Sequence, residues 1–468
     1  MWLNFNLYRS RKSGDGSRKP KLRYSDFPLL AELISYSVLS IITIAFIIVS
    51  AQGLNGQDIG YFKKVIDTLS SSTMDGRGYV NKGDKTASNF IESEFKNLSL
   101  NSFGATYLQD FAFTVNTFPG KMEVKLDHKQ LIPGVDYIVS PGSIGLSGTY
   151  KLYRFSDLLK LKENKLQKFI EKTNDHRFIV IDEKVIDKGD DKKLFDALVK
   201  TWKAKGIVLM REKLTWGVSQ ENQGYLVVEI KKELITKTSK SIYVDAENVF
   251  IPKYNTQNVI GYMRGQVPDS FIVFSAHYDH LGRMGANTWF PGANDNASGV
   301  ALMLDLAKFY KTNGDSSYYS MAFIAFAGEE AGLEGSNFYT ENPLFPLSKI
   351  RFLINLDLMG NGSEGITVVN GTVFNESFNN LVEINTKNNY LPAVNKRGKA
   401  QNSDHYYFTE KEVPSFFIYT LGGIKAYHDV YDKPDALEYI KYENIFRLIV
   451  GFVKTFVTYS PHTEIEIK

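Results

Sequence analysis

Four short runs of apolar residues recur in the second half of the chain, and their length sets the class of fold. The runs are residues 271–276 (FIVFSA), 320–327 (SMAFIAFA), 351–356 (RFLINL) and 415–420 (SFFIYT). A short, continuous apolar run predicts a strand buried on both faces, as the strands of parallel sheets are. Between the runs, helical patterns are predicted over 297–311, 333–341, 374–388 and 442–458. The alternation predicts an α/β fold with a mostly parallel central sheet flanked by helices.

Ionisable side chains gather directly after three of these predicted strands. Ligands collect at the carboxyl ends of the strands in open α/β sheets, so these positions predict a site. The strand-end residues are His277, Asp279, Glu329, Glu330 and Asp357. Two further residues of the same chemical types complete the set, Asp295 in GANDNASG and His428 in KAYHDVYDKPD.

This set of side chains suits a divalent metal ion. Two histidines with several carboxylates offer the nitrogen and oxygen ligands that hard-to-borderline ions prefer. Glu329 and Glu330 are adjacent carboxylates at a glycine-flanked turn, so they repel each other and require a nearby cation. Taken alone, Asp295 suits a helix cap, and His277 with Asp279 suits an ordinary pair at a strand end. In the metal interpretation, Asp279 instead accepts a hydrogen bond from the ring nitrogen of His277 that faces away from the ion.

The N-terminal segment predicts export from the cytoplasm. Residues 1–28 form a basic leader with seven lysines and arginines, and residues 29–51 are apolar, without a charge from Leu33 to Val49. This pattern is typical of a signal peptide or of an uncleaved transmembrane anchor. Either one places the rest of the chain in the periplasm, on the cell surface or in the medium. The chain has no cysteine, which excludes disulfides, thiolate catalysis and thiolate metal ligands.

The remaining sequence divides into three parts. Residues 54–118 contain two amphipathic helical patterns, and residues 247–460 carry the metal-ligand candidates. Between them, residues 119–246 are lysine-rich and contain short β-like runs. They contain none of the candidate metal-binding or catalytic residues, which favours an inserted β-rich domain. No basic block follows residue 28, so a nucleic-acid partner is not expected.

Five segments of the chain resemble a known family. HYDHLG, PGANDNASG, FAGEEAGLEGS, NLDLMG and AYHDVYDKPD are similar to the signature segments of the two-zinc exopeptidases that include the bacterial secreted aminopeptidases. Glutamate carboxypeptidase and the transferrin receptor ectodomain are more distant members. The resemblance implies the zinc exopeptidase fold over 247–460, with 54–118 as its N-terminal helices. By position, it implies a protease-associated-like domain for 119–246.

The resemblance also implies a role for each site residue. His277 and Asp357 would bind one zinc ion, Glu330 and His428 a second, and Asp295 would bridge the two. Glu329 would be the general base, Asp279 the partner of His277, and Tyr427 a donor to the oxyanion. The implied activity is that of an aminopeptidase, which removes N-terminal residues from peptides.

Three alternatives stay open on the same fold. A carboxypeptidase requires cations directed at the substrate carboxylate, for which Arg283 and Lys425 are candidates. A glutaminyl cyclase uses one zinc ion and lacks part of the paired set. A binding ectodomain without catalysis would have lost the metals, which the filled ligand positions argue against.

Overall fold

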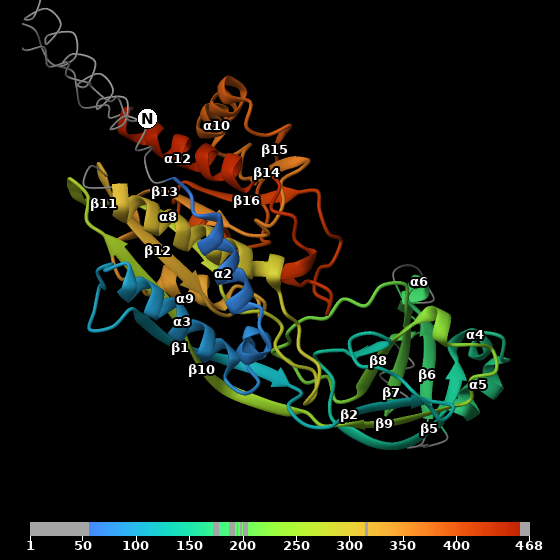
Figure 1. Cartoon of the computed structure of the whole chain (residues 1–468). Coiled ribbons are helices and arrows are strands. Elements are labelled where there is room, and N and C mark those ends of the chain that lie inside the picture. The colour runs from blue at the N-terminus through green and yellow to red at the C-terminus, as the bar shows by residue number, and fades with distance from the viewer. Residues whose placement is uncertain are drawn as a thin grey trace, which may run out of the picture. The chain divides into compact units, whose positions relative to one another are not determined.

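The computed structural model describes residues 56–458, apart from 172–176, 187–191, 194, 197–198, 200–204 and 314–316 (Figure 1). The predicted basic leader (1–28) and apolar segment (29–51) lie outside these residues. Within the described part of the chain, none of the helices has the length and apolar character needed to cross a bilayer.

An eight-stranded sheet carries the site. In spatial order it runs β1-β10-β12-β11-β13-β16-β14-β15. The strands are β1 (Leu108–Thr117), β10 (Val249–Met263), β12 (Tyr319–Phe326), β11 (Val267–His277), β13 (Ile350–Leu356), β16 (Ser415–Leu421), β14 (Gly365–Val369) and β15 (Val394–Lys396). The four central strands, β12, β11, β13 and β16, are parallel, whereas β10 and β14 pair antiparallel with them on either side. These four are the strands predicted from the apolar runs, and the α/β fold class is confirmed.

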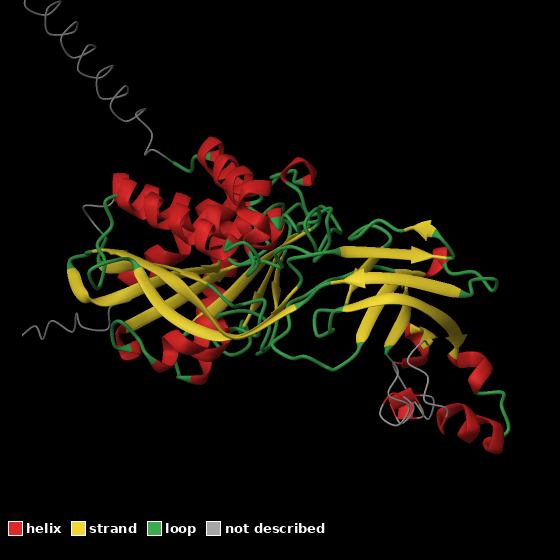
Figure 2. Ribbon diagram, turned by 90° about the horizontal axis from the view of Figure 1, so that it is seen from below, coloured by secondary structure: helices red, strands yellow, loops and turns green. Residues whose placement is uncertain are grey.

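Helices cover both faces of this sheet, as Figure 2 shows. Alternate residues of β11 enter two different cores: Ile272 and Phe274 face one, and Phe271 and Val273 the other. The first core includes residues of α2 (Ile59–Leu69), α3 (Gly83–Asn97), α8 (Gly299–Asn313), α10 (Asn375–Asn388) and α12 (Tyr442–Thr458). The second includes residues of α9 (Glu334–Glu341) and α11 (His405–Glu410). Burial on both faces explains why these strands read as unbroken apolar runs.

The N-terminal helices belong to the first of these cores. Asp58 caps α2, because its carboxylate accepts a hydrogen bond from the Tyr61 backbone N–H at 2.9 Å. Phe62, Val65, Ile66 and Leu69 form the buried face of α2 at helical spacing. A 3-10 turn over Ser72–Arg77 joins α2 to α3 and brings Arg77 and Tyr79 to the edge of the sheet that carries the site.

A second eight-stranded sheet is formed between residues 122 and 246. Its order is β3-β2-β9-β5-β6-β7-β8-β4. The strands are β2 (Met122–Leu126), β3 (Lys129–Gln130), β4 (Tyr137–Val139), β5 (Leu146–Arg154), β6 (Arg177–Asp182), β7 (Gly206–Arg211), β8 (Leu226–Lys231) and β9 (Ser241–Ala246). The short helices α4 (Phe155–Leu158), α5 (Glu163–Glu171) and α6 (Glu183–Ile186) accompany it. Its core also takes in Leu281, Met284 and Phe290 from the metal-bearing part, so the two parts share apolar contacts.

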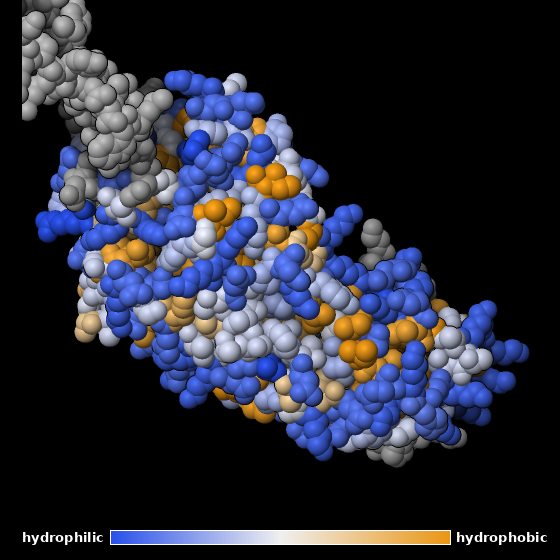
Figure 3. All heavy atoms as spheres, viewed as in Figure 1, coloured by the Kyte–Doolittle hydropathy of each residue, from blue (hydrophilic) through white to orange (hydrophobic). Residues whose placement is uncertain are grey.

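The face of the molecule seen in Figure 3 is mostly polar, with several groups of apolar side chains between the hydrophilic ones. Exposed large apolar residues among the described ones include Ile132 and Ile440, which are 56% and 54% exposed. Isolated apolar side chains of this kind are ordinary on a soluble domain.

Candidate metal centre

All five predicted ligands lie at one edge of the first sheet. His277 ends β11, Glu330 lies in the turn after β12, and Asp357 follows β13. Asp295 lies in the Ala293–Ser298 turn that leads into α8, and His428 lies in the loop after β16. The parallel central strands bring these segments together, because their carboxyl ends meet at the same edge.

His277 faces three carboxylates. Its Nε2 lies 3.4 Å from Asp295 Oδ1, 3.5 Å from Asp357 Oδ2 and 3.9 Å from Glu329 Oε2. Ser403 Oγ donates to Asp357 Oδ2 at 3.1 Å. Asp357 Oδ1 is buried and has no hydrogen-bond partner among the described residues. A buried carboxylate oxygen without a donor is costly, so this oxygen fits a position that faces a cation.

His428 faces the other oxygen of the same aspartate. Its Nε2 lies 3.0 Å from Asp295 Oδ2 and 3.2 Å from Glu330 Oε2. Asp295 therefore directs one oxygen to each histidine, as a carboxylate shared between two ions would. The donor set of two imidazoles and three carboxylates suits zinc, and these residues fit the two-metal site that the family resemblance implies.

Burial and crowded charges shift the pKa values of the whole cluster. Burial alone would lower the pKa of His428, but Glu330 and Asp295 outweigh it and raise that pKa to about 11. Burial likewise opposes the protonation of His277, yet Glu329 and Asp357 raise its pKa well above the usual value. For Glu329, burial is the main cause of a pKa well above the usual range, and Glu330 adds to it. The carboxylates thus attract protons onto the histidines in the way that they would attract metal ions.

Metal binding at this site is expected to weaken as the pH falls. Below a pKa of about 11, His428 holds a proton that a metal ion must displace. The apparent affinity should therefore fall by about tenfold per pH unit for each proton displaced. Titration of the metal-free protein with zinc against a chelating dye, between pH 6 and pH 8, measures this slope. An affinity that does not vary with pH would show that zinc does not bind through the histidines.

Asp279 has three hydrogen-bond donors in addition to the predicted partner His277. Its carboxylate accepts hydrogen bonds from Tyr79 Oη at 2.7 Å and from the backbone N–H groups of Glu329 and Glu330 at 3.2 and 3.3 Å. His277 Nδ1 lies closer to the main-chain oxygen of Asp279, at 3.2 Å, than to its carboxylate Oδ1, at 3.7 Å. The carboxylate of Asp279 therefore fixes the turn that carries the two glutamates, and its Oδ1 also faces His277 Nδ1, the partner predicted from the sequence.

Two further side chains support the ligands. Asp432 accepts hydrogen bonds from the backbone N–H groups of Asn294 and Asp295 at 2.8 and 3.0 Å. His280 Nδ1 lies 2.8 Å from Glu330 Oε1, so it contacts a predicted ligand without belonging to the set. Both residues occur within the quoted signature segments, but only the fold shows what they contact.

Arg77 is buried and directs all of its N–H groups to main-chain oxygens. It donates to the carbonyls of Leu69, Tyr278, Pro291, Gly292 and Asp295 at 2.7–3.0 Å. The guanidinium thereby links the last residue of α2 with the residue that follows β11 and with the loop that contains Asp295. Sequence reasoning missed Arg77. Its one local signal is the Gly76-Arg77-Gly78 triplet, because a Cβ at Gly78 would lie 2.4 Å from the Gly282 Cα atom.

A cavity of about 190 Å³ opens onto the ligands. Its lining consists of His277, Asp295, Glu329, Asp357, Leu358, Arg397, Asn402, Phe417, Tyr419, Tyr427 and His428. The Tyr427 ring stacks on the His428 ring, with centroids 4.0 Å apart, and burial raises the pKa of its phenol. Arg283, one of the cations considered for a substrate carboxylate, instead pairs with Asp75, and neither it nor Lys425 lines this cavity. Arg397 does, although the sequence did not single it out.

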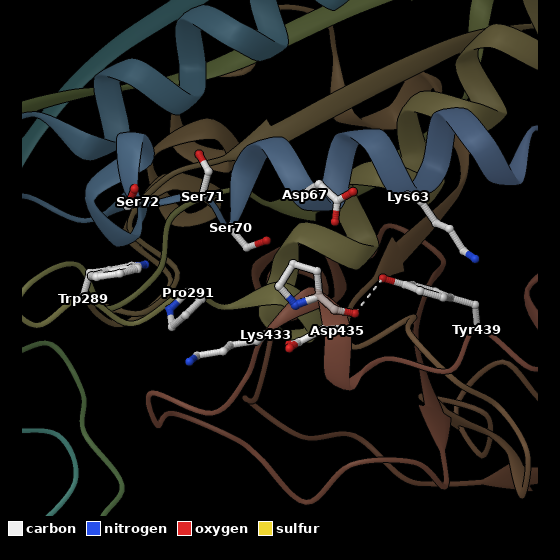
Figure 4. Close-up of a pocket in the computed structure, with 11 residues that line it drawn as sticks. Lys63, Asp67, Ser70, Ser71, Ser72, Trp289, Pro291, Lys433, Asp435 and Tyr439 are labelled. Carbon is white, nitrogen blue, oxygen red and sulfur yellow. Dashed lines mark hydrogen bonds between the residues drawn. The ribbon is translucent and has the colours of Figure 1, made fainter.

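A larger cavity, of about 540 Å³, lies away from the ligands between α2, the Trp289–Pro291 loop and residues 433–439 (Figure 4). Its charged lining residues are Lys63, Asp67, Lys433 and Asp435, and none of the metal-ligand candidates reaches it. Four of the five ligand candidates, together with Glu329, line the smaller cavity instead.

Comparison with known proteins agrees with this geometry. Residues 258–453 match the model of Peptidase family M28. Aminopeptidase YwaD from Bacillus subtilis is 30% identical over 172 residues, which are 34% of this chain and 35% of that protein. A probable leucine aminopeptidase from Arthroderma otae is 29% identical over 192 residues, which are 39% of this chain and 53% of that protein. The chain therefore spans about a third to about half the length of these relatives.

Solved structures share the fold over most of the chain. BSAP, a zinc aminopeptidase from Bacillus subtilis, superimposes with a TM-score of 0.62 at 19% identity, over 85% of this chain and 94% of that one. A peptidase M28 precursor from Shewanella amazonensis superimposes with a TM-score of 0.60 at 16% identity, over 84% of this chain and 91% of that one. The match to peptidase family M28 thus covers residues 258–453, which contain all five ligand candidates, and the solved structures show a shared fold.

Proposed function

We propose that the chain is an aminopeptidase that binds two zinc ions and hydrolyses the first peptide bond of peptides. The observation that carries the proposal is the position of Asp295, whose two oxygens lie 3.4 and 3.0 Å from the Nε2 atoms of His277 and His428. The zinc aminopeptidase fold and the M28 match support the same activity.

In this proposal, His277 and Asp357 would hold one zinc ion, Glu330 and His428 would hold the other, and Asp295 would contribute to both. Bound zinc supplies Lewis acidity, which polarises the scissile carbonyl and lowers the pKa of water. The proton transfers are carried out by side chains of the chain itself.

Since the cavity is small and partly closed, it accommodates the end of a peptide rather than an extended segment, which favours an exopeptidase.

Glu329 is the proposed general base. Its carboxylate lies 3.9 Å from His277 Nε2, close to the ligands but outside the set of five. Its carboxylate is largely buried beside the ligands, so it can accept a proton from the attacking water and return it to the leaving amine. Tyr427 lines the same cavity with a protonated hydroxyl, from which it can donate a hydrogen bond to the developing oxyanion.

Metal analysis together with substrate hydrolysis tests the proposal. Protein purified without chelators should contain close to two zinc ions per chain and should hydrolyse aminoacyl-nitroanilides. Removal of the zinc with a chelator should abolish hydrolysis, and zinc should restore it. A stoichiometry of one that added zinc does not raise would instead support a glutaminyl cyclase, and an inactive protein without zinc would support a binding ectodomain.

Arg397 favours a second candidate function, that of a carboxypeptidase. Among the described residues that line the cavity, it is the one lysine or arginine, and its guanidinium could pair with a substrate carboxylate. The two functions make opposite predictions for Arg397→Gln. An aminopeptidase should hydrolyse aminoacyl-nitroanilides, which have no carboxylate, with less than about a threefold change.

A carboxypeptidase should instead lose about tenfold or more with Arg397→Gln on N-blocked peptides that carry a free carboxylate, since a charged hydrogen bond is removed. Steady-state kinetics on both substrate classes measure the difference. Lys399→Gln is the matched control, because Lys399 pairs with Glu410 and does not line the cavity.

We further propose that the protein acts outside the cytoplasm. The support is the basic leader followed by an apolar segment of residues 29–51. Cell fractionation locates the protein, and N-terminal sequencing of the exported form distinguishes a cleaved signal peptide from a retained anchor. Recovery of the protein in the cytoplasm alone would contradict export.

A further inference from the structure

We propose that residues 213–220, the bridging segment, position two of the metal-binding loops although they belong to the inserted part of the chain. The segment connects β7 to β8 of the second sheet. The inference rests on the metal centre proposed above. In this inference, a loop of the second sheet helps to orient the metal ligands. This role would be separate from any influence of the second sheet on which peptides reach the cavity.

The first contact is with the metal ligand His428. The Trp216 backbone N–H donates to the His428 carbonyl at 2.9 Å, and His428 Nδ1 lies 3.1 Å from the Trp216 carbonyl oxygen. An Nδ1–H that donates to this carbonyl leaves Nε2 free for a metal ion and fixes the plane of the ring. His428 has a positive φ of 53°, and the pair of hydrogen bonds holds it in this strained conformation.

The bridging segment is itself firmly anchored in the second sheet. The Trp216 side chain is 6% exposed and stacks on Phe290, with ring centroids 4.5 Å apart. Its indole N–H donates to the Val139 carbonyl, in β4, at 2.7 Å. Because the ring is fixed at both its face and its N–H, the carbonyl that faces His428 has little freedom to move.

The second contact is with the turn that carries Glu329 and Glu330. Gln220 Nε2 donates to the Ala331 carbonyl at 2.7 Å and to Glu334 Oε1 at 2.6 Å. These bonds join the bridging segment to the turn immediately after the glutamates. The opposite side of the turn is held by Asp279, so Gln220 completes its support.

A third contact reinforces the His428 loop. Lys213 Nζ lies 3.5 Å from Asp429 Oδ2 and donates to the Lys425 carbonyl at 2.9 Å. Asp429 is buried and accepts hydrogen bonds from the Tyr427 and Tyr431 backbone N–H groups at 3.4 and 2.9 Å. One segment of eight residues thus contacts both loops that would bind the second zinc ion.

Zinc affinity of three variants tests the inference. In Gln220→Ala the turn loses its two hydrogen bonds, and in Trp216→Ala the carbonyl that faces His428 loses its anchor. Both variants should bind zinc at least about tenfold more weakly than the wild type, the usual scale for residues that orient ligands. The matched control is Gln223→Ala, because Gln223 lies in the same connection but, among the described residues, bonds to Ser143 and Gly142 and to neither metal-binding loop. Its zinc affinity should stay within twofold of the wild type.

Two further measurements separate positioning from folding. Thermal unfolding of the metal-free proteins reports stability, and the visible absorption of cobalt-loaded protein reports ligand geometry. The inference stands if Gln220→Ala binds zinc more weakly and changes the cobalt spectrum while the metal-free melting temperature is unchanged. It is overturned if Gln220→Ala matches the control in zinc affinity and spectrum, whatever Trp216→Ala does to folding. A wild-type protein that binds no zinc would refute the metal centre itself.

Discussion

Substitution of Glu329 by glutamine is expected to lower peptide hydrolysis by about 100-fold or more while leaving the zinc content unchanged. Glutamine keeps the size and the hydrogen-bonding shape of the side chain but cannot accept a proton from water. Glu329 lies near His277 and Asp357, but the proposal assigns it as the base and not as a ligand, so its loss should not release metal. Steady-state kinetics on an aminoacyl-nitroanilide and elemental analysis of the same sample measure both quantities.

The neighbouring glutamate provides the control for this experiment. Glu330 Oε2 lies 3.2 Å from His428 Nε2, and its other oxygen lies 2.8 Å from His280 Nδ1. Glu330→Gln should therefore lose zinc together with activity. The opposite pattern, in which Glu329→Gln loses zinc and Glu330→Gln retains it, would show that the roles of the two glutamates are reversed.

Substitution of Arg77 by methionine is expected to lower the free energy of unfolding by about 3 kcal/mol or more, because buried carbonyls lose their donors. Arg77 donates to five main-chain oxygens, and methionine can replace none of these hydrogen bonds. Urea unfolding of the metal-free protein measures the loss. Since one of the five oxygens belongs to Asp295, zinc affinity should fall as well.

Two other substitutions calibrate the Arg77 result. Arg77→Lys keeps the charge but offers three donors without the planar fork, so its stability should fall between those of methionine and the wild type. Arg447→Met removes an exposed arginine that pairs only with Glu443 along α12, and it should change stability by less than about 0.5 kcal/mol. A loss below about 1 kcal/mol for Arg77→Met would mean that water replaces the guanidinium.

The sheet and the ligands were predictable because their signals are local. The run FIVFSA and the histidine that follows it lie in consecutive positions, so the strand and the position of His277 at its end are read together. The same holds for Glu330 and Asp357. The strands β1 and β10 were not predicted, because β1 alternates between buried and exposed residues and the first half of β10 is mostly exposed, which gives a weaker pattern than a continuous apolar run.

The supporting residues could not be predicted because their contacts span the chain. Tyr79 reaches Asp279 across 200 positions, and His428 meets Trp216 across 212. No spacing rule relates such pairs, since they depend on how the helices and the second sheet pack. For the same reason, exchange of residues 119–246 for a short linker is expected to weaken zinc binding, because the contacts of Trp216 and Gln220 would be lost.

All five metal-ligand candidates lie between residues 277 and 428, yet the groups that orient them begin at Arg77. A fragment cut to the bounds of the family match would keep every ligand and lose Arg77, Tyr79 and Trp216. Such a fragment contains the ligand side chains but not the residues that orient them, so it should not regain zinc binding on refolding. The smallest part of the chain that can bind zinc is therefore expected to be much larger than the region of the family match. Transfer of that region alone to another protein is not expected to transfer zinc binding.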